Sequence, residues 1–261
     1  TGWGQEGAQR TSRAYGIPNI CRPQRQYAGV VLAKYEGQNT EISMIFYNKL
    51  AATPLFQGLT NSDLTQIIGQ TKFSFYKFAS DKTIRNEGEP CRSMAFLLSG
   101  TARVITYSDD HGFSVEETIA APYILQPERL FGLNQRYTHN FIANSECDIM
   151  EIDKNDILRL TDEFVILRIN LLNIISTLSQ KATRPLWQPS PDNDMGRIIR
   201  FLKSRCSSPV GKKTIRIKMT RLAQETGLGR LAVSKELNRL QERRLLMFSR
   251  GIITITNMEK L

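Results

Sequence analysis

The chain has 261 residues, of which 41% are hydrophobic, so a wholly disordered chain is excluded and two domains are favoured over one. The net charge is +10, but residues 183–261 hold 17 Lys and Arg against 6 Asp and Glu, whereas residues 1–182 hold 18 against 19. The C-terminal third therefore carries a net charge of +11, which indicates either a polyanionic partner or a solvated basic surface.

Cysteine spacing and hydropathy exclude further classes. The four cysteines lie far apart without a CxxC pair, which excludes zinc-ribbon and iron–sulfur spacings: Cys21, Cys91, Cys147 and Cys206. We expect His111 and His139 to be surface or hydrogen-bonded histidines rather than ligands, and predict no metal site and no certain cofactor. The most apolar run, residues 164–178, is too short and too often interrupted to span a bilayer. With no signal-peptide core at the N-terminus, a cytoplasmic protein without a membrane partner is expected.

The N-terminal part divides into two segments. Residues 1–40 are rich in Gly, Gln and Arg without periodicity, which predicts a flexible extension. Residues 41–160 are predicted to form a sensor domain. Thr60 or Asn61 would cap a short helix that runs through Ile68. Short β-branched and aromatic segments separated by turns then predict a small β-barrel or β-roll, at 72–78, 94–100, 102–108, 113–120, 139–145 and 147–153.

A helical pattern follows from about Asp153. Apolar residues at heptad spacing form a seam of Leu160 followed by Phe164, Leu167, Leu171, Ile174 and Leu178. A second apolar face consists of Val165, Ile166, Ile169, Leu172 and Ile175. We predict a dimerisation helix over residues 161–182, in which the seam meets a partner helix and the other face packs on the barrel. The alternative is one helix buried inside a single subunit.

A proline-bearing link at residues 183–194 predicts a hinge between domains. The remaining residues, 195–261, begin with an amphipathic helix in which Ile198, Ile199 and Leu202 would face a core. The alternation in "KKTIRIKM" (residues 212–219) then predicts a short strand.

The stretch that follows predicts a helix-turn-helix. A helix at about 220–226, a turn at Gly227 and a helix at about 230–243 are followed by a strand–turn–strand wing around residues 249–251. Val233, Leu237 and Leu240 would form the buried stripe of the second helix. Exposed polar and basic residues near its N-terminus can face base edges in the major groove, and arginines elsewhere can neutralise phosphates. The predicted DNA interface comprises Arg230, Leu231, Ser234, Lys235, Asn238, Lys218, Thr220, Arg221, Arg239 and Arg250.

Two stretches carry a resemblance to a known family. "IRNEGEPCRSMAFLLSGTARVI" (84–105) and "LAQETGLGRLAVSKELNRLQERRLL" (222–246) resemble the Crp/Fnr family of bacterial regulators, typified by the cyclic-AMP receptor protein. The resemblance covers about residues 45–261. It implies an α+β fold with an N-terminal β-roll or jelly-roll sensor, a long dimerisation helix and a C-terminal winged helix-turn-helix. It also implies a homodimer whose further partners are double-stranded DNA and RNA polymerase.

Departures from the family pattern bear on specificity. The resemblance places Arg230 and Lys235 at base-facing positions, but Leu231 stands where a glutamate is frequent, so a different operator is expected. In the segment that resembles the cyclic-nucleotide cassette, "LFGLNQRYTHNF" (130–141), Leu133 replaces the acidic residue that would bind the ribose. We therefore expect an effector other than cyclic AMP, an unknown small molecule or none. Candidate pocket residues are Glu87, Gly88, Glu89, Phe131, Gly132, Arg136 and Thr138.

The favoured function is a sequence-specific transcriptional regulator that binds an inverted repeat as a homodimer. The alternative is a small-molecule sensor whose C-terminal domain engages protein or RNA rather than DNA. An enzyme is disfavoured because the chain has no nucleophile elbow, P-loop, HExxH or Rossmann glycine fingerprint, and no catalytic residue is predicted.

Overall fold

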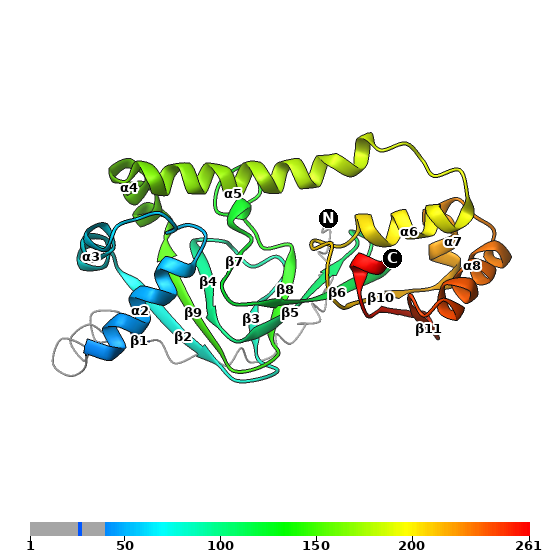
Figure 1. Ribbon diagram of the computed structural model, residues 1–261, viewed down its shortest axis with the longest axis horizontal. Coiled ribbons are helices and arrows are strands. Elements are labelled where there is room, and N and C mark those ends of the chain that lie inside the picture. Colours follow the sequence, from blue (N-terminus) through cyan, green and yellow to red (C-terminus); the bar gives the residue numbers. More distant parts are fainter. Residues whose placement is uncertain (1–25, 28–39) are drawn as a thin grey trace, which may run out of the picture.

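The computed structural model describes residues 26–27 and 40–261. The predicted flexible extension, residues 1–40, falls almost wholly outside this part of the chain. The chain has an α+β fold with two sheets. The predicted sensor domain (41–160, called the sensor below) lies at one end and the C-terminal domain (195–261) at the other, and a long helix and a shared sheet join them (Figure 1). The helices are α2 (Thr40–Ala52), α3 (Asn61–Gln70), α4 (Lys154–Glu163), α5 (Val165–Thr183), α6 (Asp194–Ser204), α7 (Met219–Thr226) and α8 (Arg230–Glu242).

The first sheet is formed by the sensor domain and by Gln26–Tyr27, a short strand within the segment predicted as a flexible extension. Its strand order is β1 (Gln26–Tyr27), β2 (Phe73–Phe78), β9 (Cys147–Asp153), β4 (Ser93–Ser99) and β7 (Tyr123–Leu125), and all pairings are antiparallel. Gly100 (φ +87°) occupies the turn between β4 and β5 (Thr101–Tyr107), where any Cβ would collide with the carbonyl oxygen of Glu146. Thr60, one of the two predicted caps, is the N-cap of α3, and it forms a capping box with Asp63.

The second sheet runs through both domains. Its strand order is β11 (Met247–Ser249), β12 (Ile252–Ile255), β10 (Lys213–Ile217), β6 (Phe113–Ala120), β5 (Thr101–Tyr107), β8 (His139–Ala143) and β3 (Thr83–Arg85). Strands β11, β12 and β10 come from the C-terminal domain, whereas the other four come from the sensor. The junction is the antiparallel pairing of β6 with β10, which sequence patterning did not predict.

A buried ion pair lies at this junction. The Lys213 ammonium is 2.8 Å from the Glu117 carboxylate, and their side chains are 1% and 4% exposed. The same carboxylate accepts hydrogen bonds from the backbone N–H groups of Ser207 and Ser208. Because a buried charge needs a partner and satisfied hydrogen bonds, these contacts make Glu117 compatible with the interior.

Two hydrophobic cores share one face of the second sheet. The sensor core includes Phe56, Phe96 and Phe141, whereas the C-terminal core is built on α6, α7, α8 and the wing. Phe113 and Val115, from sensor strand β6, are buried in the C-terminal core rather than in that of their own domain. The two domains therefore meet through apolar packing as well as through strand pairing.

Helix α5 presents a different face to the sensor from the predicted one. Phe164, Leu167 and Leu171 of the predicted dimer seam are buried against the sensor core of their own subunit, and Ile174 packs partly against it. The seam prediction is wrong in orientation: the face left exposed is that of Val165, Ile166, Ile169 and Leu172. Heptad spacing marks apolar stripes, but both faces of this helix carry one, so spacing could not say which covers the sensor.

The start of the long helix also differs from the predicted span. Phe164 is extended (φ −113°, ψ 103°) and separates α4 from α5, so the dimerisation helix predicted from residue 161 begins at Val165. Leu178 near the other end of α5 is half-buried. Short 3-10 turns complete the description, at Pro127–Arg129, Arg184–Trp187 and Met258–Lys260. None of the helices in the described residues has the length and apolar character that a membrane span needs.

Candidate nucleic-acid interface

Helices α7 and α8 form the predicted helix-turn-helix. Gly227 ends α7 in the left-handed region (φ +66°), where its N–H donates to the carbonyls of Ala223 and Gln224. Leu228 then donates to the Ala223 carbonyl, and α8 begins after the N-cap Gly229. Leu222 and Ala223 of α7 are buried as predicted. This turn holds α8 against α7. The residues that both helices bury in the core then determine which side of α8 is exposed to solvent.

Helix α8 has one buried stripe and one exposed face. Val233, Leu237 and Leu240 are each 0% exposed, as the spacing predicted. Because they hold one side against the core, the other sides carry the five residues that were predicted to be exposed. Arg230, Leu231, Lys235 and Asn238 are exposed and Ser234 is half-buried. Leu231 is 89% exposed, which is unusual for a leucine that serves only packing.

Two of the predicted DNA-binding arginines are already engaged by carboxylates. Arg221 lies 2.9 Å from Asp110 of the sensor and 2.9 Å from Glu225 of its own helix. Hydrogen bonds from the Ser108 hydroxyl and the Gly112 N–H, with the Arg221 charge, hold the pKa of Asp110 below its ordinary value. Arg239 lies 2.8 Å from the buried Glu236. Both guanidinium groups therefore form ion pairs within the chain. The prediction of DNA contacts did not consider these carboxylates, which lie one turn away in the same helix or in the sensor.

The other predicted contacts lie at the ends of neighbouring elements. Lys218 is the exposed N-cap of α7, and Thr220 is exposed in its first turn. Arg250 occupies the wing tip between β11 and β12 with a positive φ of 49°, followed by Gly251. The N–H of Ile217 donates to the carbonyl of Gly251, so the wing tip lies beside the start of α7. The structure thus brings Lys218 and Arg250 to the same end of the sheet.

The predicted effector residues also come together, but they are bonded to one another. The turn at Glu87–Glu89 pairs with the segment around Arg136, because Gly88 N–H donates to the Tyr137 carbonyl and Tyr137 N–H donates to the Glu89 carbonyl. The Arg136 guanidinium donates to the Gly88 carbonyl at 2.7 Å. Thr138 is held through its hydroxyl and its N–H by the side chain of Gln126.

The remainder of the cassette is exposed or buried in an apolar setting. Phe131 is half-buried under the ammonium of Lys154, Gly132 has a positive φ of 88°, and Leu133 is fully exposed. Tyr137 is 2% exposed, and burial raises the pKa of its hydroxyl above the ordinary value. The two groups that sequence reasoning left for an anion, Arg136 and Thr138, therefore have partners within the chain.

Two family models match the chain. The cyclic nucleotide-binding domain matches residues 76–164, and the Crp-like helix-turn-helix domain matches residues 196–261. Together they cover more than half of the chain, in the order and in the two regions that the fold shows. The chain belongs to the Crp/Fnr family of DNA-binding transcription regulators.

Solved structures that resemble this regulator are distant in sequence. The catabolite activator protein of Thermus thermophilus is 16% identical, with 80% of this chain and 95% of that chain covered and a TM-score of 0.41. The c-di-GMP-responsive regulator CLP of Xanthomonas campestris is 15% identical, with 76% and 99% covered and a TM-score of 0.42. FixK2 of Bradyrhizobium japonicum is 16% identical, with 72% and 94% covered and a TM-score of 0.40. No curated protein matches the chain.

Three carboxylates of this Crp/Fnr regulator were not singled out by its sequence as parts of the DNA-binding domain. Asp110 and Glu117 come from sensor strands or turns and contact Arg221 and Lys213 across the domain junction. Glu236 is buried within α8 itself. The signals for Glu236 are its position directly before Leu237 of the buried stripe and its place three residues before Arg239, a spacing that allows an ion pair on a helix. No local signal marks Asp110 or Glu117, because their partners lie about 100 residues away.

Proposed function

We propose that the protein is a sequence-specific transcriptional regulator that binds an inverted repeat as a homodimer, with α8 in the major groove of each half-site. The observation that supports this most directly is the fully buried stripe Val233, Leu237 and Leu240, which fixes α8 against the core while Arg230 and Lys235 remain exposed. A helix held in this way presents its N-terminal residues to base edges while the preceding helix crosses the backbone.

The exposed face of α8 suggests how bases are distinguished. Arg230 and Lys235 are donors suited to guanine O6 and N7, and Asn238 is suited to adenine. Leu231 has no hydrogen-bonding group and is suited to the methyl group of thymine. Such a combination favours an operator that contains thymine where relatives with an acidic side chain would select cytosine.

Selection of bound duplexes from a random library tests this function. We expect an inverted repeat whose half-site centres lie one helical turn, about 34 Å, apart, with affinity that falls steeply as salt rises. As a control, Arg92→Ala, which removes an exposed arginine directly before sensor strand β4, is expected to select the same sequences as wild type. Recovery of sequences without a shared motif would overturn the proposal.

The homodimer is supported by the exposed apolar face of α5. Val165, Ile166, Ile169 and Leu172 are 55%, 41%, 49% and 59% exposed, and they lie at helical spacing on one side. We propose that this face packs against the same face of a second copy in a twofold arrangement. Ile169→Lys is expected to yield monomers in light-scattering measurements, whereas Val210→Lys, at a residue 56% exposed in a loop, is expected to remain dimeric. A dimeric Ile169→Lys protein would contradict this interface.

The effector is proposed not to be cyclic AMP. The Arg136 guanidinium donates to the Gly88 carbonyl and its side chain is exposed, and Leu133 offers no acceptor for a ribose hydroxyl. Titration calorimetry of the full chain with cyclic AMP is expected to show no binding, and the thermal midpoint is expected not to rise with nucleotide. Saturable binding that Arg136→Ala abolishes would reverse this conclusion.

RNA polymerase is the proposed protein partner on promoter DNA.

A further inference from the structure

The sensor and the C-terminal domain are joined in two ways. One is the covalent link that follows α5, where residues 188–193 belong to no helix or strand and all but Pro191 are exposed. The other is the antiparallel pairing of β6 with β10. An exposed link by itself leaves two domains free to rotate. The contacts at the paired strands therefore decide whether α8 moves relative to the sensor.

Strand β6 completes the sheet of the C-terminal domain. It pairs with β10 from Phe113, opposite Ile217, to Glu117, opposite Lys213, while β12 pairs with the other side of β10. Without β6, one side of β10 would be an edge with unpaired backbone N–H and C=O groups. The central strand of the C-terminal domain thus depends on a strand of the sensor.

The core of the C-terminal domain is completed in the same way. Phe113 and Val115 are 8% and 2% exposed and belong to that core. The Phe113 ring lies 5.6 Å from the ring of Phe201 on α6, and the Arg205 guanidinium lies over both rings. Separation of the domains would expose Phe113 and Val115 to water, so apolar burial opposes it.

Two ion pairs connect the domains near the ends of β6. The buried Lys213 ammonium contacts the Glu117 carboxylate, and a slip of one residue would turn Lys213 to the other face and leave Glu117 without its cation. At the hairpin tip, Asp110 lies 2.9 Å from Arg221 of α7. Because α6 and α7 share one core with α8, these contacts hold α8 in one position relative to the sensor.

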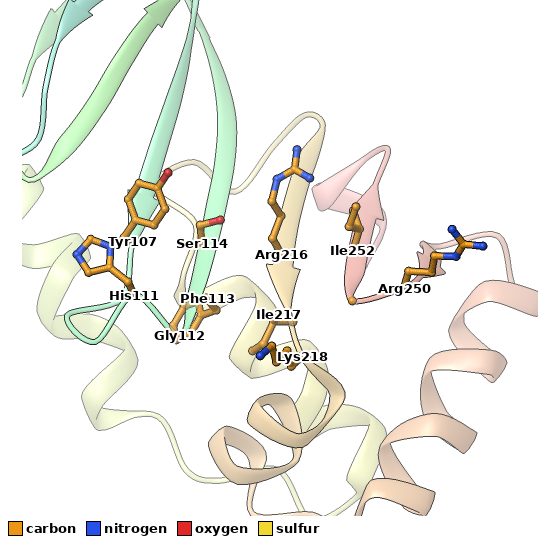
Figure 2. A pocket seen from close by; sticks show the side chains of 11 residues that line it. Tyr107, His111, Gly112, Phe113, Ser114, Arg216, Ile217, Lys218, Arg250 and Ile252 are labelled. Atoms are coloured by element: carbon orange, nitrogen blue, oxygen red, sulfur yellow. The ribbon is translucent and has the colours of Figure 1, made fainter. Parts of the chain in front are cut away.

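The outer face of the same junction borders solvent. Ser114 lies directly opposite Arg216, and the residues on either side of each belong to the C-terminal core, so this pair projects from the opposite face (Figure 2). A hollow of about 320 Å³ lies there, lined by Tyr107 and Ser114 of the sensor and by Arg216, Lys218 and Arg250 of the C-terminal domain. A cross-link between positions 114 and 216 would therefore join the two domains without entering either core.

We propose that the junction of β6 with β10 stays closed when the regulator binds operator DNA and that it, rather than the covalent link, sets the separation of the two α8 helices in the homodimer. The inference rests on the proposed function. Each α8 is fixed to its own sensor through the junction, and each sensor to its own α5 through the buried Leu167 and Leu171. The proposed contact between the exposed faces of α5 then connects one α8 to the other without a free hinge.

A reversible disulfide tests whether the junction opens. Ser114→Cys with Arg216→Cys places two thiols at directly opposed positions of antiparallel strands, where the separation of the Cα atoms suits a disulfide. The oxidised and the reduced protein are expected to bind the selected operator with the same affinity. Binding that appears only after reduction would overturn the proposal, because the junction would then have to open. Thr214→Cys with Thr254→Cys is the matched control, since it joins β10 to β12 within the C-terminal domain on the same face.

A cut in the covalent link tests which connection sets the separation. A protease site inserted after Ser190 allows the folded protein to be cleaved between its domains. The cleaved protein is expected to remain one complex in native mass spectrometry and to keep the operator spacing of the uncut protein. One extra base pair between the half-sites moves one of them by about 3.4 Å and turns it by about 35°. Cut and uncut protein are both expected to lose about tenfold or more in affinity for that duplex.

The outcomes separate this inference from the proposed function. Separation of the two pieces after cleavage, or tolerance of the extra base pair, would overturn the inference and leave specific binding standing. Loss of binding in the protein cross-linked between positions 114 and 216 would do the same. Absence of specific binding by the wild-type protein would overturn both.

Discussion

The recognition face of α8 and the cassette of the sensor differ in what their polar groups contact. On α8, Arg230 and Lys235 are exposed and their position is fixed by a core beneath them. In the cassette, the Arg136 and Thr138 side chains bond to Gly88 and Gln126 of the same chain. A family pattern therefore has a functional meaning only where its donors remain available to a ligand. In this protein Arg230 and Lys235 have exposed side chains on α8, whereas Arg136 and Thr138 of the cassette form hydrogen bonds within the chain.

The ion pair between Glu117 of the sensor and Lys213 of the DNA-binding domain is where a substitution is expected to have the largest effect. Lys213→Met leaves the buried Glu117 carboxylate without its cation, and the expected cost is about 3–5 kcal/mol in the free energy of unfolding. Urea denaturation followed by circular dichroism measures it. The double variant Lys213→Met with Glu117→Gln should recover most of the loss, since a neutral amide oxygen still accepts from Ser207 or Ser208. A single variant within about 1 kcal/mol of wild type would show that the ion pair is not needed.

Two leucines of α8, one buried and one exposed, test the difference between the buried and the exposed face of this helix. Leu237→Ala is expected to destabilise the protein by about 2–5 kcal/mol, because it opens a cavity beneath the helix. Leu231→Ala is expected to change stability by less than about 0.5 kcal/mol. Thermal or urea unfolding compares the two, and DNA selection should show altered preference only for the folded Leu231→Ala protein. Equal losses of stability would mean that Leu231 packs against part of the fold.

Asp110 tests whether the sensor limits the charge that the DNA-binding domain presents. Asp110→Asn is expected to free Arg221 and to tighten DNA binding by about threefold, with a salt slope steeper by about 0.9. Fluorescence anisotropy over a salt series measures both quantities. Asp109→Asn removes the same charge from the neighbouring exposed position and is expected to have a smaller effect. Identical behaviour of the two variants would attribute the change to net charge rather than to Arg221.

His139 offers the smallest expected effect, on the sensor side. Burial lowers the pKa of His139, so the unfolded chain takes up a proton near pH 6.5 at which the folded chain does not. Stability should thus be unaffected above about pH 7 and decline as the pH falls toward 5.5. His139→Gln is expected to reduce that decline, whereas His111→Gln serves as the control. Urea midpoints at pH 7.5 and 5.5 give the measurement, and equal slopes in wild type and His139→Gln would refute it.

Much of the fold follows from local pattern. Alternation and turn residues predicted six strands of the sensor, and helical spacing predicted α7, α8 and the residues buried beneath α8. The pairing of β6 with β10 was not predictable in this way, because it depends on segments about 100 residues apart. The orientation of α5 failed for a different reason: both of its faces are apolar, and only the shape of the sensor decides which is covered.

The candidate site likewise contains some residues that local sequence pattern identifies and others whose contacts depend on distant segments. The exposed residues of α8 follow from three buried positions in the same helix, so sequence alone identified them. The i,i+3 spacing of Glu236 and Arg239 allows their ion pair to be predicted from the sequence, but the pair of Arg221 with Asp110 of the sensor depends on how the two domains meet. The hollow around Arg216 likewise requires two domains to meet.

The proposed function requires the exposed face of α8 to distinguish bases. The binding profile of wild type and Arg230→Ala against every single-base variant of the selected operator tests this most directly. We expect Arg230→Ala to lose about 1–3 kcal/mol of discrimination at one or two positions in each half-site, placed symmetrically about the centre. A uniform loss of affinity across all positions would contradict the claim, because it would assign Arg230 to the phosphate backbone.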